Sequence, residues 1–516
     1  MKIDRRKFLL HGASTAALGC AFPATTPAWQ SAAAPRVDLA KDPLRPQVHL
    51  LPPANWINDP NAPIYWKGRY HMFYQYNPDG AYWGNMHWGH AISDDMIHWK
   101  HFPLALSPTP GGPDAEGCFT GTAVVQDDHP MVLYTGVVAA PLDRATSKGA
   151  LNLRETQCLL TSNDPDLKTW TKLDAPVLAE PPTGMQVNGF RDPSPWRQGD
   201  WWYMVLGAGV ANRGGVVLLY KSKDLHHWEF MHVLAGRDAE AEHNFEPFNP
   251  WETWECPELF ALDGKHVLIF STLGKAYWQS GELDPHTMQF RAEHAGILDY
   301  GSYYAPKTQL DKAGRRILWG WIQESRPLEQ YKAAGWAGMM SLPRVLALDA
   351  EGKLLSRVAP EADSLRDREQ SVNVSGDEER VLGQIDALRI EKCCGELRCV
   401  VRSTAENFGI TLAGAGSMSS PWISVKYDRQ RPAELSIDAH PIPLQREAGE
   451  DFNLEFYVDS SVIEFFVNGR VAYTKRFYYS DSQPQDIGVK WTGSTKNLVR
   501  LSCYRLTPIS ADRLTT

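Results

Sequence analysis

The sequence lacks several features that would place it in other functional classes. No stretch reaches 18 consecutive apolar residues, so we predict no membrane-spanning helix. The HExxH metal pattern, the GxSxG nucleophile turn, the phosphate-binding P-loop and the glycine pattern of dinucleotide-binding folds are all missing. A net charge of -9 and a pI near 6.0 disfavour nucleic acid as a partner. We therefore predict no metal, no cofactor and no nucleic acid partner.

Cysteine is also scarce. Of the eight cysteines, Cys20 lies in an N-terminal stretch that resembles a cleaved leader. The other seven are an odd number, so at least one is unpaired unless it pairs between chains. Cys393, Cys394 and Cys399 lack a second ligand pair at zinc-finger spacing. A chain exported already folded would not need a disulfide framework, which agrees with this count.

Residues 1–34 have the pattern of an export signal. The segment DRRKFLL at 4–10 fits the twin-arginine pattern, a mildly apolar run follows, and Ala32 to Ala34 offer a cleavage site. We therefore expect a periplasmic or extracellular protein. Lipoprotein anchoring at Cys20 is a weaker alternative, because Ala17 stands where Leu is expected. A disordered N-terminus of a cytosolic protein is the other alternative.

Repeated short hairpins dominate the chain up to about residue 345. With 516 residues, the chain exceeds the usual single-domain size, so two domains are expected. Five times, an apolar run meets a polar turn and a second run rich in β-branched and aromatic residues. These predicted hairpins span 64–74, 124–134, 196–206, 259–270 and 310–321. Their spacing predicts a five-bladed β-propeller over residues 35–350.

The C-terminal part has a different pattern. Residues 351–370 are charged and predict a linker, with room for a short helix. Alternating runs at 452–458 and 462–467, an Asn468-Gly469 turn and further runs at 487–491 and 498–506 predict strands. The fold class is therefore all-β, with a β-sandwich over residues 371–516 after the propeller. We expect this sandwich to support the propeller or to bind carbohydrate.

Three acids of the propeller half lie in turns beside proline and aromatic residues. They are Asp59 in NWINDPN at 55–61, Asp192 in FRDP at 190–193, and Glu255 in WECPELF at 254–260. Loops of different blades converge on the axis of a propeller, so these acids can meet there. Glycosidic cleavage needs two carboxylates with separate roles. For Asp59 taken alone, an Asx-turn with no catalytic role is the simpler interpretation.

These motifs, taken in order, resemble glycoside hydrolase family 32, the β-fructofuranosidases. YHMFYQYNP at 70–78, WGNMHWGHA at 83–91, YYAPKT at 303–308 and GWAGMMSLPR at 335–344 also match it. The resemblance covers nearly the whole mature chain and implies a propeller followed by a sandwich. It also implies a retaining enzyme with Asp59 as nucleophile, Glu255 as general acid/base and Asp192 as transition-state stabiliser. Asp59 and Glu255 would then lie about 5–5.5 Å apart.

The same resemblance implies the residues that bind substrate. They are Asn58, Gln75, Trp83, Phe119, Thr120, Arg191, Trp56, Tyr304 and Trp336. Three positions depart from the family pattern: Ala62 for Gly, Thr120 for Ser, and Glu258 for Asp. None of them removes a catalytic group. The loop at 238–253 is longer than in the simplest members, and we expect it to influence substrate length.

Alternatives remain on the same residues. An exported hydrolase that releases terminal fructose from sucrose or fructans is the first hypothesis. A fructosyltransferase would use the same acids with a sugar as acceptor, and an endo-acting fructanase would need a more open cleft. A non-catalytic fructan-binding protein disagrees with the intact acids. An inverting arabinan- or xylan-cleaving propeller enzyme would lack the WINDPN motif.

Overall fold

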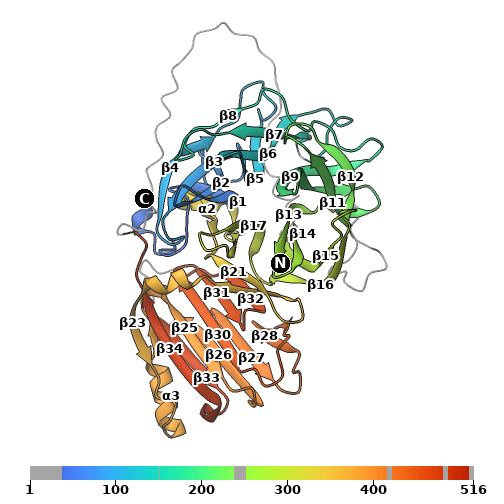
Figure 1. The fold of residues 1–516 in the computed structure, drawn as a ribbon. Coiled ribbons are helices and arrows are strands. Elements are labelled where there is room, and N and C mark those ends of the chain that lie inside the picture. The colour runs from blue at the N-terminus through green and yellow to red at the C-terminus, as the bar shows by residue number, and fades with distance from the viewer. Residues whose placement is uncertain (1–37, 150, 237–251, 415–420, 480–485, 511–516) are drawn as a thin grey trace.

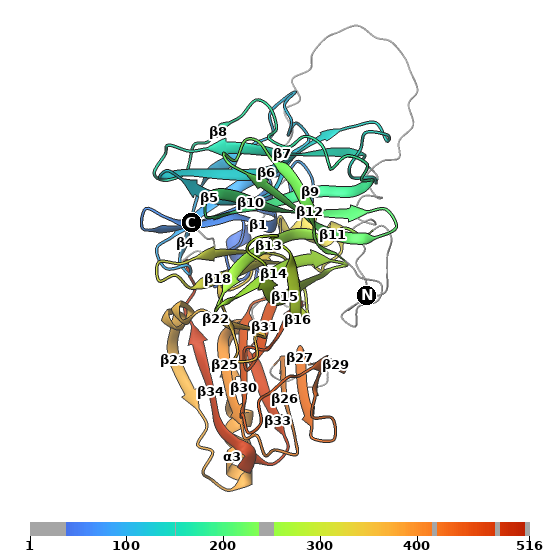
Figure 2. The same cartoon turned by 45° about the vertical axis from the view of Figure 1, so that its right-hand side comes forward.

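The computed structural model describes residues 38–149, 151–236, 252–414, 421–479 and 486–510. The predicted leader and most of the loop at 238–253 lie outside these ranges. Almost all regular elements are strands, arranged as a propeller above a sandwich (Figures 1 and 2). The helices are η1 (Leu39–Lys41), α2 (Leu328–Ala334), η2 (Pro360–Leu365), α3 (Glu378–Ala387), η3 (Glu391–Cys393) and η4 (Thr495–Asn497).

Five antiparallel sheets follow one another around a centre in the N-terminal half (Figure 1). The first has β1 (Asn55–Trp66), β2 (Arg69–Asn77), β3 (His87–Ser93) and β4 (Trp99–Leu106), and the second has β5 (Gly117–Gln126), β6 (His129–Ala139), β7 (Leu153–Thr161) and β8 (Thr171–Lys172). The third has β9 (Val187–Gln198), β10 (Trp201–Val210), β11 (Gly214–Ser222) and β12 (Glu229–Gly236). The fourth has β13 (Glu255–Leu262), β14 (Lys265–Thr272), β15 (Lys275–Leu283) and β16 (Phe290–Asp299). The fifth has β17 (Tyr303–Leu310), β18 (Arg316–Ile322), β21 (Arg344–Leu348) and β22 (Leu354–Val358).

The first strands of these sheets form a closed ring. β1, β5, β9, β13 and β17 each contact the next in that order, and β17 contacts β1 again. Two short strands strengthen the closure. β19 (Trp336–Ala337) pairs in parallel with β1, and β20 (Met339–Met340) pairs with β18. The all-β propeller is thus confirmed, and its five described sheets agree with the predicted number of blades.

Each of the five predicted hairpins is the first strand pair of one sheet. β1 pairs with β2, β5 with β6, β9 with β10, β13 with β14, and β17 with β18. The hairpin signal was local, because polar turn residues separated two apolar runs. All five hairpins are confirmed.

The C-terminal half is a sandwich of two six-stranded sheets, as predicted. One sheet runs β23 (Arg366–Ser371), β34 (Leu498–Leu506), β25 (Cys394–Val401), β30 (Phe452–Asp459), β31 (Val462–Val467) and β32 (Val471–Arg476). The other runs β24 (Arg389–Ile390), β33 (Ile487–Thr492), β26 (Asn407–Gly414), β27 (Ile423–Asp428), β28 (Glu434–Ile437) and β29 (His440–Pro443). Asn468 and Gly469 both have positive φ, 53° and 70°, as a tight hairpin turn requires.

The chain passes from propeller to sandwich between β22 and β23. The predicted linker at 351–370 thus includes β22, the short helix η2 and most of β23. All seven described cysteines are buried. No helix in the described ranges is long and apolar enough to cross a membrane.

Buried charges join the two halves. Asp459 on β30 accepts hydrogen bonds from the backbone N–H groups of Gln47 (2.7 Å) and Val48 (2.7 Å) and from Nδ1 of His49 (2.8 Å). The other ring nitrogen of His49 lies 3.0 Å from Glu464 Oε1 on β31. The segment that leads into β1 is thereby fastened to the sandwich.

Arg344 on β21 continues this network. Its guanidinium bonds to Glu464 and, at 2.9 Å, to Asp299 Oδ2 on β16. Asp299 also accepts hydrogen bonds from the backbone N–H (2.8 Å) and the hydroxyl (2.6 Å) of Thr474 on β32. We call His49, Asp299, Arg344, Asp459 and Glu464 the interface cluster. Its side chains have no exposed surface.

Candidate active site

A β-bulge recurs at the same place in all five inner strands. In each strand, two residues face one residue of the partner strand. The bulged pairs are Asn58–Asp59, Phe119–Thr120, Asp192–Pro193, Cys256–Pro257 and Ala305–Pro306. A bulge changes the direction of the side chains that it carries. Three of the bulges hold a residue other than glycine at positive φ, namely Asp192 (66°), Cys256 (50°) and Ala305 (51°).

Asp59 is held by a ring of hydrogen bonds. Asn58 Nδ2 donates to Asp59 Oδ1 (3.0 Å) and to Gln75 Oε1 (2.8 Å). Gln75 Nε2 donates to Thr120 Oγ1 (2.7 Å), and the Thr120 hydroxyl donates to Asp59 Oδ2 (2.7 Å). Trp56 Nε1 donates to Asn58 Oδ1 (2.7 Å) and fixes the orientation of the amide. Asp59 is 4% exposed, so its carboxylate is both oriented and nearly dry.

Cys256 connects the acids of three sheets. Its thiol donates to Asp59 Oδ2 at 3.5 Å, and its backbone N–H donates to Asp192 Oδ2 at 2.8 Å. Burial, followed by the nearby carboxylates of Asp192 and Asp59, holds the pKa of the thiol well above its usual value. The thiol therefore stays protonated. The carboxylates of Asp59, Asp192 and Glu255 all act on the thiol, and Asp59 and Glu255 also act on Asp192, so the three acids meet around this cysteine.

The pKa of Asp192 rises to about 7. Burial is the main cause; Asp59 and Glu255 add to it, and the guanidinium of Arg191 opposes it. The Asp192 backbone N–H donates to the Thr135 hydroxyl (2.9 Å), which fixes the bulge. Near neutral pH this carboxyl group can therefore change its charge.

Glu255 has a different neighbour at each oxygen. The Tyr304 hydroxyl donates to Oε2 at 2.5 Å, and Arg191 Nη2 donates to Oε1 at 3.0 Å. Arg191 also pairs with the buried Glu155. A carboxyl group between a phenol and a guanidinium is well placed for proton transfer to a ligand beside it.

Aromatic side chains surround these groups. Trp83 lies edge-on to Phe119, with ring centroids 5.9 Å apart. Trp56, Tyr304 and Cys256 belong to the same hydrophobic cluster, against which Trp83 and Phe119 pack. The structure thus brings eleven of the twelve sequence-predicted site residues into one connected set.

Trp336 is the exception. Its ring packs on the guanidinium of Arg326, and its indole nitrogen donates to Asp42 Oδ2 (2.6 Å). Ala337, its neighbour on β19, packs in the cluster with Trp56. Because successive side chains of a strand point to opposite faces, Trp336 points away from the acids.

Two family models match this chain in sequence. The one described as "Glycosyl hydrolases family 32 N-terminal domain" matches residues 49–358, and "Glycosyl hydrolases family 32 C terminal" matches 361–505. This chain belongs to glycosyl hydrolase family 32.

Known proteins of similar sequence and fold agree with the family. A sucrose-6-phosphate hydrolase of Escherichia coli is 37% identical over 462 residues, which cover 86% of this chain and 90% of that protein. A raffinose invertase of Escherichia coli is 35% identical over 456 residues, which cover 84% and 89%. The solved Bombyx mori β-fructofuranosidase BmSUC1 has a TM-score of 0.71 at 29% identity and covers 92% of this chain and 96% of its own. The chain is therefore a glycoside hydrolase of the β-fructofuranosidase type.

The three departures from the family pattern have structural explanations. Ala62 is fully buried at φ 42°, a conformation that is easier for the usual Gly. Thr120 keeps the hydroxyl that bonds to Asp59. Glu258 accepts a hydrogen bond from the Thr308 backbone N–H at 2.9 Å, so its carboxylate supports β17.

Two residues near the acids were not found by sequence reasoning. The sequence indicates no chemical role for Cys256 in the WECPELF motif, yet its thiol contacts Asp59. Glu155 was not singled out, although it binds Arg191. It lies on β7, outside every recognised motif, so a single sequence carried no signal for it.

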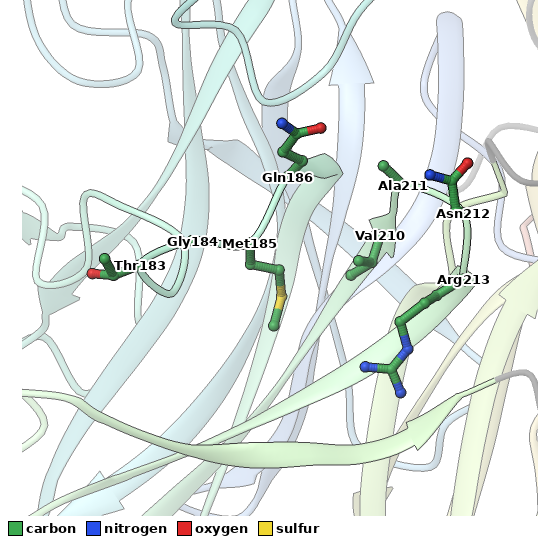
Figure 3. A pocket seen from close by; sticks show the side chains of 8 residues that line it. All are labelled: Thr183, Gly184, Met185, Gln186, Val210, Ala211, Asn212 and Arg213. Atoms are coloured by element: carbon green, nitrogen blue, oxygen red, sulfur yellow. The ribbon is translucent and has the colours of Figure 1, made fainter.

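A separate cavity of about 400 Å³ lies on the third sheet (Figure 3). It is lined by Thr183, Gly184, Met185 and Gln186 before β9 and by Val210, Ala211, Asn212 and Arg213 at the turn between β10 and β11. None of the predicted site residues lines it, so it is not the place where the acids meet.

Proposed function

We propose that this chain is an exported, retaining hydrolase that releases terminal β-D-fructofuranosyl units from sucrose or fructans. One observation carries the proposal: Asp59, Asp192 and Glu255 meet around Cys256 at the inner strands of a family 32 propeller. The oriented carboxylate and the neighbouring proton donor are the two groups that retaining glycosidases use.

Asp59 acts as the nucleophile. Its carboxylate attacks the anomeric C2 of the fructosyl unit while the bond from C2 to the leaving oxygen breaks, which forms a covalent fructosyl-enzyme ester. The bonds from Asn58 and Thr120 favour this role, because they hold the attacking group in a fixed direction.

Glu255 acts as the general acid and then as the general base. It gives its proton to the leaving oxygen in the first step. In the second step it takes a proton from the water that attacks C2 and releases Asp59. Tyr304 and Arg191, which bind its two oxygens, support the positioning of this group.

Asp192 binds fructosyl hydroxyls and stabilises the positive charge that develops on the ring. Trp83 and Phe119 supply an apolar wall for the sugar. The printed names of the relatives extend the candidate substrates to raffinose and sucrose 6-phosphate.

Export is part of the proposal and rests on the twin-arginine pattern at 4–10. N-terminal sequencing of protein from the periplasmic or extracellular fraction tests it. A mature N-terminus near Pro35 is expected. Full-length protein confined to the cytoplasm would refute export and leave the catalytic proposal intact.

A product profile tests the activity. The mature protein is given sucrose, raffinose, sucrose 6-phosphate, inulin and levan separately, and the released sugars are resolved over time. Free fructose from the start is the expected result. Early oligosaccharides from a polymer would indicate an endo-acting fructanase, and oligomers growing from sucrose would indicate a fructosyltransferase. With methanol as acceptor, retention predicts methyl β-D-fructofuranoside, and the α anomer would refute it.

A further inference from the structure

Glu155 is a buried carboxylate beside the site, with no role in the reaction described above. It lies on β7, the third strand of the second sheet, and its exposure is 0%. Oε2 accepts hydrogen bonds from the Phe190 backbone N–H (2.6 Å) and the Thr146 hydroxyl (3.1 Å). Oε1 pairs with Arg191 Nη1. A buried charge is costly, so its retention beside Arg191 needs a reason.

The guanidinium of Arg191 is divided between two acids. Nη1 bonds to Glu155, and Nη2 bonds to Glu255 Oε1 at 3.0 Å. The other oxygen of Glu255 is bound by the Tyr304 hydroxyl. Glu155, Arg191, Glu255 and Tyr304 therefore form a chain of hydrogen bonds across four sheets of the propeller.

An undivided guanidinium would work against a proton donor. A cation next to a carboxyl group favours the ionised form, whereas the first step needs the protonated form. Glu155 binds one side of the Arg191 guanidinium and compensates part of its positive charge. The negative charge of Glu155 also disfavours ionisation of Glu255. Although burial disfavours its charge, Arg191 has a pKa well above the usual value because of Glu155, Glu255 and Asp192.

Other titratable or charged groups lie around this chain of residues. They are Asp59 on β1, Asp192 on β9, Cys256 on β13 and Lys307 on β17. Arg191 Nη1 bonds to Glu155, whereas Nη2 bonds to Glu255, so substitution of Glu155 tests its contribution to the charge around Glu255.

We propose that Glu155 is a positioning residue for the general acid: it holds Arg191 and takes up part of its charge, so that Glu255 keeps its proton. The inference rests on the proposed function, because it takes Glu255 as the general acid.

Glu155→Gln tests it, since the amide keeps the shape and removes the charge. We expect kcat for sucrose to fall about tenfold or more, because general acid catalysis is impaired. The alkaline limb of the pH profile should move down by about one pH unit, because Arg191 then favours ionised Glu255 more strongly. The loss should be smaller with an aryl β-fructofuranoside whose leaving group needs no proton. KM should change little.

Glu396→Gln is the matched control. Glu396 is also a buried acid, 1% exposed and paired with the guanidinium of Arg366, but it lies in the sandwich. Its variant should show the stability cost of such a change with a wild-type pH profile. Glu155→Asp keeps the charge and shortens the arm, so its alkaline limb should stay near that of the wild type while kcat falls several-fold.

The inference is overturned if folded Glu155→Gln keeps the wild-type kcat and alkaline limb, or loses activity equally on both substrates. If Glu155→Gln does not fold, wild-type kcat in Glu155→Asp overturns it. Loss of sucrose hydrolysis in Glu255→Gln shows that the proposed function holds in either case. Full activity in that variant would refute the proposed function itself.

Discussion

The active site and the interface cluster both bury several carboxylates, but their charges are balanced differently. At the site, Arg191 is shared between Glu155 and Glu255, while Asp59 and Asp192 lie close by. Burial and the surplus of negative charge raise the pKa of Asp192 to about 7. In the interface cluster, Arg344 and His49 bind Asp299, Asp459 and Glu464 between them.

The balance of positive and negative charge around each buried group determines the direction of its pKa shift. Burial disfavours the charge of Glu464, but Arg344 and His49 outweigh it and lower the pKa to about 2. The same partners act in reverse on His49. Burial opposes its charge, yet bonds to Asp459 and Glu464 raise its pKa to about 9. Closely matched charges thus stabilise the junction of the two halves, whereas the active site holds more negative than positive charge.

The largest expected effect lies at the site. Asp59→Ala and Glu255→Ala should each lower kcat for sucrose by about three orders of magnitude or more, because one removes the nucleophile and the other the acid. Steady-state kinetics measure the loss, and circular dichroism checks the fold. Azide should partly rescue Glu255→Ala with an activated fructoside. Wild-type turnover in either variant would remove that residue from its proposed role.

Breaking the balance at the interface should cost stability instead of chemistry. Glu464→Gln removes a negative charge that balances the buried positive charges of Arg344 and His49. We therefore expect a loss of roughly 3–5 kcal/mol in the free energy of unfolding. Thermal unfolding measures it. Glu351→Gln removes the exposed partner of Lys353 and should change stability by less than about 1 kcal/mol. Equal losses in the two variants would mean that burial of the pair is irrelevant.

Removing the excess negative charge at the active site should raise the free energy of unfolding instead of lowering it. Folded Asp192 keeps its proton up to about pH 7, against an ordinary value of 3.8, so its ionisation destabilises the fold as the pH rises through this interval. Asp192→Asn should therefore gain stability at pH 8, by roughly 4 kcal/mol at most, and nearly nothing at pH 4. Activity should be lost. Melting temperatures at both pH values measure the gain, and a gain that is equal at the two would contradict the assignment.

The smallest effect concerns His49. Its folded pKa of about 9 exceeds the unfolded value of 6.5, so its stabilising contribution is complete below 6.5 and is lost as the pH rises toward 9. The loss is roughly 3 kcal/mol. Unfolding of the wild type between pH 6 and 10 should show this decline, and His49→Gln should flatten it. A variant with the same slope as the wild type would assign the decline to other groups.

Local signals made much of the fold predictable. Turn residues between two apolar runs marked five hairpins, and alternation marked the strands of the sandwich. The closure of the ring was not readable, because β19 is two residues long and pairs with Asn55 and Trp56 across almost 280 intervening residues. The interface cluster was equally hidden, since it joins His49 to residues more than 400 positions away.

The active-site residues that lie in sequence motifs were predictable. Asp59, Asp192 and Glu255 stand beside prolines in recognisable motifs, and the family resemblance extended them to Asn58 and Thr120. Trp336 shows the limit: a motif names a residue, but the pleat of a strand decides which way it points. Glu155 shows the complementary limit, because its contact with Arg191 exists only after two sheets pack together.

The same β-bulge occurs in the first strand of each of the five described sheets, around the axis of the propeller. Equivalent bulge positions carry Asn58, Phe119, Asp192, Cys256 and Ala305, so an amide, a ring, an acid, a thiol and a methyl group occupy the same place in their strands. The chemistry at each bulge therefore depends mainly on which side chain the bulge carries, and much less on the shape of the sheet. At Ala305 the backbone adopts a positive φ with only a methyl group, and that group is fully buried, so the packing around this bulge leaves the position to a small side chain.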